Sequence, residues 1–342
     1  MVYGWVGPLQ NVERIVPDYA ANYNAASQNN INGLEIITSG TDNLGLGNNA
    51  LDSLTSGNYN TAVGKLAMTA TTSGERNTAV GREALVSNTT GNYNVAIGMN
   101  SLVTNVSGHK NTGLGYASLQ QNTTGADNVA VGTDSLKQNT TGAGNVAVGK
   151  SALTDNTTGT EHVAVGYEAL ANNTTGHSST AVGNLALLTA TTGSDNTAIG
   201  CKTQRYTTTG ANNVSVGSNS LDSNTTGVRN VATGVHALGG NTTGADNIGI
   251  GYEALKVTET SSNNIAIGAY SFSSAYGIQN TALGDRSGLS LTSANYNTFL
   301  GNRAGHTTTT GNSNVCVGNY ARTGAGNTVN SIVVGDNISG DG

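Results

Sequence analysis

The chain has 342 residues, of which 48 are glycine, two are proline and 10% are charged. So few prolines exclude collagen and polyproline stalks, and the many alanine, valine, isoleucine and leucine residues argue against disorder. The net charge of -6 provides no basic surface for a phosphate backbone, and no apolar stretch reaches the length of a membrane span. We therefore expect a folded protein that neither binds nucleic acid nor inserts into a membrane.

The first segment, residues 1–40, differs in composition from the rest of the chain. It contains both prolines, Pro8 and Pro17, together with Trp5 and Tyr3. It lacks the charged start and long apolar run of a secretion signal, so we expect no targeting function. Two interpretations remain: a cap over the first strand edge of the following domain, and an attachment segment that docks onto a larger assembly. For attachment, the candidate residues are Trp5, Tyr3 and Pro8.

From residue 41 to residue 342 the chain is one repeat domain. A glycine that follows an aliphatic residue recurs in 18 copies, every 17 residues apart from one step of 16. We call this glycine position zero and name each coil after it. These glycines are Gly47, Gly64, Gly81, Gly98, Gly115, Gly132, Gly149, Gly166, Gly183, Gly200, Gly217, Gly234, Gly251, Gly268, Gly284, Gly301, Gly318 and Gly335.

The positions around this glycine alternate in polarity. Position minus one is aliphatic in 17 of 18 copies, with Thr233 as the exception, and it is predicted to lie in the core. Position minus two is nearly always Ala, Gly or Ser, and position plus four is Leu, Met or Phe in 13 copies. Asn-Thr-Thr-Gly sequences follow in many copies. The pattern predicts two short strands and two glycine turns in each repeat.

One such repeat cannot bury its apolar residues alone, whereas stacked repeats share a continuous core. We expect an all-β fold, a β-solenoid of about 18 coils and roughly 85 Å, with identical residues stacked in ladders of Val/Ile, Leu, Asn and Thr. Charge supports this interpretation, because none of the 30 charged residues from Thr41 onward occupies positions minus four to zero. The charged positions are predicted to be exposed turns.

The repeat Asn128-Val129-Ala130-Val131-Gly132 and its copies resemble the head repeats of trimeric autotransporter adhesins of the YadA type, whose motif reads Asn-Ser-Val-Ala-Ile-Gly. The resemblance implies a left-handed parallel β-roll that assembles as a homotrimer, over residues 41 to about 335. This sequence departs from the family in its longer coil, and it has no secretion signal, coiled-coil stalk or membrane β-barrel. Similar repeats occur in phage tail-fibre proteins, which assemble in the cytoplasm and need no signal.

These resemblances favour a structural and adhesive fibre of a virion, on its tail or head. The fibre would attach to a virion or baseplate protein through its N-terminus and contact a glycan or protein of the host surface. The alternative is the head domain of a bacterial surface adhesin. Two further alternatives are a fibre-borne glycan depolymerase, which needs paired carboxylates in a groove, and an ice-binding solenoid, suggested by stacked pairs such as Thr140-Thr141.

Sequence motifs for other chemistry are weak. The five histidines have no metal-ligand spacing and are expected at the surface, and the recurrent residue is Asn rather than the Asp that calcium-binding repeats require. We expect no catalytic residues, no cofactor and no metal. Cys201 and Cys316 occupy different repeat positions, so we expect no disulfide between them.

Position plus one offers candidate receptor contacts. Tyr116, Tyr167 and Tyr252 share this position, and aromatic faces stack on sugars or anchor protein contacts. The alternative is ordinary exposed packing.

Overall fold

The computed structural model describes residues 29–31, 34–37, 41–274 and 276–340 of the chain. The three proposed attachment residues, Trp5, Tyr3 and Pro8, lie outside this part. All regular structure in the described residues is β-strand, so no helix there could cross a membrane.

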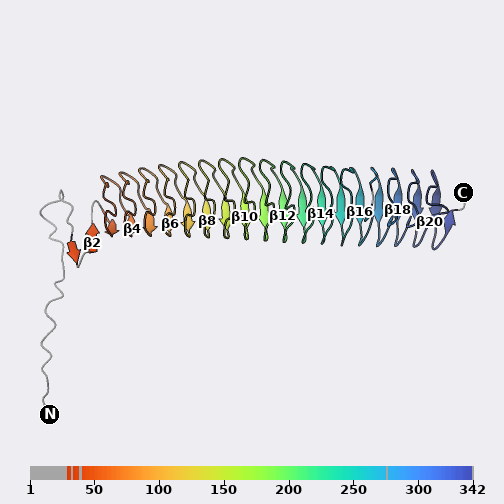
Figure 1. Ribbon diagram of the computed structural model, residues 1–342, viewed down its shortest axis with the longest axis horizontal. Helices are drawn as coiled ribbons and strands as arrows, with labels where there is room; N and C mark the ends of the chain where they lie inside the picture. The colour runs from red at the N-terminus through yellow and green to blue at the C-terminus, as the bar shows by residue number, and fades with distance from the viewer. Residues whose placement is uncertain (1–28, 32–33, 38–40, 275, 341–342) are drawn as a thin grey trace, which may run out of the picture.

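The repeat domain is a parallel β-solenoid of about 17 turns, seen in Figure 1 as a row of coils whose strands lie side by side. Each strand pairs in parallel with the equivalent strand of the next coil, in the register set by the repeat, as with Val146↔Val163 and Val148↔Val165. The strands are β3 (Leu44–Leu46), β4 (Thr61–Val63), β5 (Thr78–Val80), β6 (Val95–Ile97), β7 (Thr112–Leu114), β8 (Val129–Val131), β9 (Val146–Val148), β10 (Val163–Val165), β11 (Thr180–Val182), β12 (Thr197–Ile199), β13 (Val214–Val216), β14 (Val231–Thr233), β15 (Ile248–Ile250), β16 (Ile265–Ile267), β17 (Thr281–Leu283), β18 (Thr298–Leu300), β19 (Val315–Val317) and β21 (Ile332–Val334).

The two ends of this sheet differ. At the N-terminal end β1 (Asn29–Ile31) and β2 (Leu34–Ile37) form an antiparallel hairpin, and β2 pairs antiparallel with β3. This hairpin covers the backbone edge of the first coil, which would otherwise be a template for pairing with other chains. At the other end the short strands β20 (Arg322–Thr323) and β22 (Ser339–Gly340) pair in parallel beside the main sheet.

Each coil contains one strand of the main sheet, so the prediction of two strands per repeat is wrong. The cause is the backbone at positions plus two and plus four, which is left-handed, as at Ser151 (φ 57°) and Leu153 (φ 53°). Left-handed residues at alternate positions turn the chain and cannot belong to an extended strand. The glycine at position zero is required: Gly149 has φ 137°, and a Cβ there would lie 2.3 Å from the carbonyl oxygen of Gly166.

The core lies between position minus two of the strand and positions plus three and plus four of the following turn. In the Gly149 coil, Ala147, Ala152 and Leu153 are fully buried. Position minus one was predicted to be buried, but Val148 is only partly buried and Ile97, Leu114 and Leu300 are 39 to 43% exposed. Successive strand residues face opposite sides of a sheet, so the small residue at minus two enters the thin core and its two aliphatic neighbours face outward.

Two ladders of asparagine hold the coils together, as the repeat predicts. At position minus four, the backbone N–H and the side-chain amide of Asn145 both donate to Oδ1 of Asn128, at 3.0 and 3.1 Å, and the amide also donates to the carbonyl oxygen of Gly159 at 2.9 Å. At position plus seven, the amide of Asn139 donates to Oδ1 of Asn122 at 2.8 Å. Both ladders are buried, so along runs of Asn the coils satisfy many of each other's polar groups. The plus-seven ladder is interrupted, as at Ala190, and Oδ1 of Asn156 has no hydrogen bond.

The expected positions of charge are confirmed, whereas the expectation for histidine is wrong at one residue. No Asp, Glu, Lys or Arg is among the buried side chains of the described residues. His162, however, is fully buried because it replaces Asn at position minus four. Its Nε2 donates to the carbonyl oxygen of Gly176 at 2.7 Å, and its Nδ1 accepts from the backbone N–H of Ser179 at 3.2 Å, which reproduces the bonds of the ladder.

Candidate functional site

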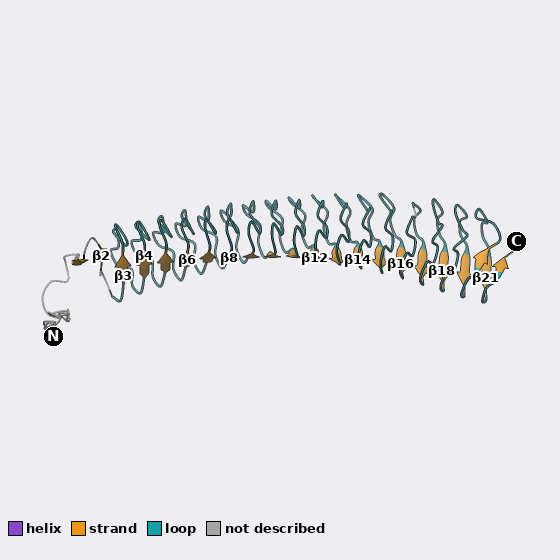
Figure 2. Ribbon diagram, turned by 60° about the horizontal axis from the view of Figure 1, so that its bottom comes forward, coloured by secondary structure: helices purple, strands orange, loops and turns teal. Residues whose placement is uncertain are grey.

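The outer face of the sheet carries aliphatic side chains along the length of the rod: position minus one is aliphatic in 17 of 18 coils, and position minus three is aliphatic in 11 coils and Thr in seven. Figure 2 shows the strands forming one continuous side, opposite the projecting turns. The side chains at positions minus three and minus one point away from the core. The aliphatic residues at position minus one, which were predicted to be buried, therefore lie on this outer face. Its members that are 36 to 43% exposed are Leu44, Val80, Ile97, Leu114, Val163, Ile199, Val214, Val216, Ile250, Ile265, Leu283 and Leu300. Soluble monomers rarely expose a continuous apolar surface of this kind.

The three candidate tyrosines are exposed but do not form one site. Tyr116, Tyr167 and Tyr252 are each 44 to 45% exposed. Tyr116 and Tyr167 are three coils apart, and Tyr252 is five coils further along. At about 4.8 Å per coil these separations are roughly 14 and 24 Å, so no single small ligand spans them.

The surroundings of these tyrosines differ. The Glu168 carboxylate raises the pKa of Tyr167 by hydrogen bonding, and Glu253 raises the pKa of Tyr252 in the same way. The ring of Tyr252 also meets that of Tyr270 edge-on, with centroids 5.2 Å apart. Tyr252 is therefore the one of the three that joins a larger aromatic surface.

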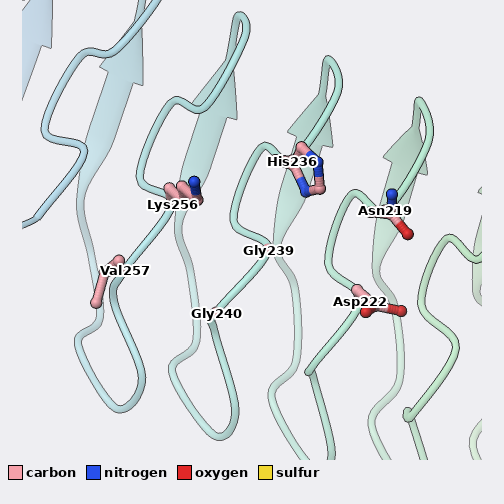
Figure 3. Close-up of a pocket in the computed structure, with 7 residues that line it drawn as sticks. All are labelled: Asn219, Asp222, His236, Gly239, Gly240, Lys256 and Val257. Atoms are coloured by element: carbon pink, nitrogen blue, oxygen red, sulfur yellow. The ribbon is translucent and has the colours of Figure 1, made fainter.

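A shallow hollow of about 340 Å³ interrupts the turns near the middle of the C-terminal half. Gly239 occupies position plus five, where the neighbouring coils carry Asp222 on one side and Lys256 on the other, and Gly240 follows it. Figure 3 shows these side chains flanking the bare backbone. Asn219, His236 and Val257 complete the lining. The absence of side chains at the two glycines creates the hollow, which analysis of the repeat positions alone had not identified.

The charges that line this hollow are paired with residues of the same surface. Asp222 accepts a hydrogen bond from Arg205 at 2.9 Å, and partial burial raises the pKa of this carboxyl. Lys256 donates to Glu253 at 3.0 Å, which lowers the pKa of Glu253. The hollow presents polar groups suited to a small hydroxylated or charged molecule. Its one lining carboxylate, Asp222, and its lining cation, Lys256, are each paired with an opposite charge outside the lining.

Other candidate chemistry is sparse in the described residues. They contain no group of three or more His, Cys, Asp or Glu side chains arranged to hold a metal ion. Cys201 is exposed, Cys316 is buried and neither forms a disulfide, as predicted. Burial raises the pKa of the Cys316 thiol to about 11, which keeps it protonated and unreactive at neutral pH.

Comparison with known proteins adds no family assignment: no protein-family model matches the chain, and no curated protein matches it significantly.

Proposed function

We propose that the chain forms the shaft of an adhesive fibre in which three copies pack together through the aliphatic outer face of the sheet. The observation that carries this proposal is the row of outward aliphatic residues at positions minus three and minus one. Covering this face removes apolar area from water, at about 25 cal/mol for each Å². A threefold arrangement, with a left-handed coil, is what the resemblance to YadA-type heads implies, and it repeats one contact around a closed ring.

Sedimentation equilibrium of the full chain tests the assembly. We expect a trimer at micromolar concentration, and a double variant Val131→Asp with Val165→Asp should be largely monomeric, because it places carboxylates on the outer face. The matched control is Gln138→Asp with Asn172→Asp, which adds the same charge to exposed turns of the same two coils. The control should remain trimeric. A monomeric wild-type chain, or equal effects of the two double variants, contradicts the proposal.

We further propose that the fibre belongs to a virion, is attached through residues 1–40 and contacts the host surface, with a structural rather than an enzymatic role. Support comes from the repeat itself, which commits most side chains to stacking and leaves the turns free to vary and to bind. Immunogold labelling with antibodies against the rod should decorate virus particles in the source culture. Label on bacterial envelopes instead would favour the alternative, a surface adhesin.

A further inference from the structure

A short stretch near the C-terminal end of the rod has more arginine than acidic residues, before Asp336 and Asp341 restore the balance. Residues 268–323 contain three arginines, Arg286, Arg303 and Arg322, and one acidic residue, Asp285, whereas the whole chain has a net charge of -6. The repeat does not require Arg286 and Arg303, because they occupy position plus two, which varies from coil to coil, whereas Arg322 lies in β20 at position plus four. The excess of cations in these coils therefore needs another explanation.

Four successive coils carry aromatic or guanidinium side chains at position plus two: Tyr270, Arg286, Arg303 and Tyr320. All four have the same left-handed backbone, with φ between 53° and 56°. Equal backbone conformation in stacked coils makes the four side chains leave the rod along one line. Neighbours in this line are about 4.8 Å apart, the spacing of adjacent strands.

Contacts within the line hold the side chains in place. The guanidinium of Arg286 lies 5.3 Å from the ring centroid of Tyr270, and that of Arg303 lies 5.1 Å from the ring of Tyr320 and donates to its hydroxyl oxygen. Tyr252 meets Tyr270 edge-on, and His306 meets Tyr320 edge-on at 5.7 Å. Such packing reduces the entropy that these side chains lose when a ligand binds.

The two arginines at the centre of the line are incompletely neutralised. Arg286 forms an ion pair with Asp285 at 2.9 Å, whereas the contacts of Arg303 described above are with the neutral phenol of Tyr320. Like charges on adjacent coils repel each other, and one carboxylate does not balance two guanidinium groups. An anion placed beside Arg303 would relieve this repulsion and accept bidentate hydrogen bonds.

We propose that the line from Tyr270 to Tyr320, extended by Tyr252 at position plus one, binds an acidic polysaccharide that lies along the rod, with Arg303 and Arg286 engaging its carboxylates and the tyrosines packing against its sugar rings. This inference rests on the proposed role of the rod as an adhesive fibre. A polymer fits better than a single sugar, because the side chains repeat at an interval close to the length of one sugar residue in an extended chain. Nucleic acid is the other polyanion that these two arginines could engage, so RNA is included in the test below.

Binding of the full chain to polygalacturonate and to polysialate, measured by biolayer interferometry, tests the proposal. At least one of these two acidic polysaccharides should bind, whereas neutral dextran and polyglutamate should not. The change Arg303→Gln should weaken binding about tenfold, the loss expected for one charge-assisted contact. Arg303→Lys should recover only part of the affinity, because lysine lacks the bidentate geometry.

The matched control is Arg76→Gln, since Arg76 also lies against tyrosine rings, at 5.1 and 5.4 Å, but in the N-terminal half of the rod. Its affinity should stay within about twofold of wild type. Binding to neither acidic polysaccharide, equal binding of polyglutamate or RNA, or equal losses for Arg76→Gln and Arg303→Gln would overturn the inference. A trimer that does not bind overturns this site alone, whereas a monomeric chain in sedimentation overturns the fibre.

Discussion

At the scale of single residues, His162 shows what a place in the asparagine ladder demands. The imidazole replaces an amide and still makes one bond to a carbonyl oxygen and one from a backbone N–H. Because Nδ1 accepts, the proton of the neutral ring must be on Nε2. A second proton would occupy Nδ1 and break the bond from Ser179. Burial, the main cause, and repulsion by His177 lower the pKa of His162 below its usual value of 6.5.

Stability should therefore fall as the pH is lowered. The unfolded chain binds a proton near pH 6.5 and the folded chain only at lower pH, so the contribution of His162 is complete above pH 6.5 and declines as the pH falls towards the folded pKa. We expect the melting temperature to drop between about pH 7.5 and 5, and His162→Asn, which restores the ladder residue, to reduce the drop. The exposed His109→Asn variant serves as control, and a slope unchanged by His162→Asn would contradict the assignment.

At the scale of one coil, a larger side chain on one side of the core compensates for a smaller one on the other side. Phe299 takes position minus two, where most coils have Ala, and Gly305 takes position plus four, where most have Leu. A Cβ at Gly305 would lie 2.5 Å from the Phe299 ring, so the ring fills the space of the missing leucine. Phe272, at position plus four of the preceding coil, fills the space at Gly288, and the two phenylalanine rings meet edge-on at 6.0 Å.

A double-mutant cycle measures this compensation. Phe299→Ala should cost about 3–5 kcal/mol by leaving a cavity, and Gly305→Leu about 1–3 kcal/mol by overpacking. The combination Phe299→Ala with Gly305→Leu restores the common Ala and Leu pair, so it should be more stable in urea than the sum of the single changes indicates. Strict additivity of the two changes would show that the two sites do not share one volume.

The assignment of inside and outside within a strand has a separate test. Ala147→Leu should lower the free energy of unfolding by about 1–3 kcal/mol, because Ala147 is fully buried against a filled core. Lys150→Ala, on an exposed turn of the same coil, should change it by less than about 0.5 kcal/mol. Urea denaturation of both variants gives the comparison, and equal effects would mean that position minus two does not face the core.

The sequence was sufficient to predict the solenoid, its register and its polar ladders, because a fixed period places equivalent residues in contact. It misled at position minus one, since an aliphatic residue in a strand indicates burial without saying whether its own chain or another copy provides the cover. Ala147 carried the missing signal: a coil this thin accepts only a small side chain on the inner face. The prediction of a second strand was wrong because Ser and Leu do not reveal that the backbone at Ser151 and Leu153 is left-handed.

The candidate site was harder to predict than the fold. Tyr252 was identified by its place at position plus one of the repeat. Its partner Tyr270 lies at position plus two, so a comparison of residues at one repeat position does not reveal their contact. The hollow at Gly239 and Gly240 depends on the side chains of adjacent coils, and its signal was the pair of glycines between Asp222 and Lys256.

At the scale of the whole molecule, about 17 turns at the spacing of adjacent strands make a rod of roughly 80 Å, with one aliphatic side and turns that differ along its length. Joining three such rods through the aliphatic side would leave the turns outside for binding. Because identical coils stack in register, one contact between copies repeats at every turn, and many weak contacts add up to a stable fibre.

A cryo-EM reconstruction of the full chain tests this account most directly. We predict three parallel rods of about 80 Å, related by a threefold axis, with the strands facing that axis and the turns facing solvent. Isolated single rods, or rods that meet through their turns with the sheet exposed to solvent, would contradict it.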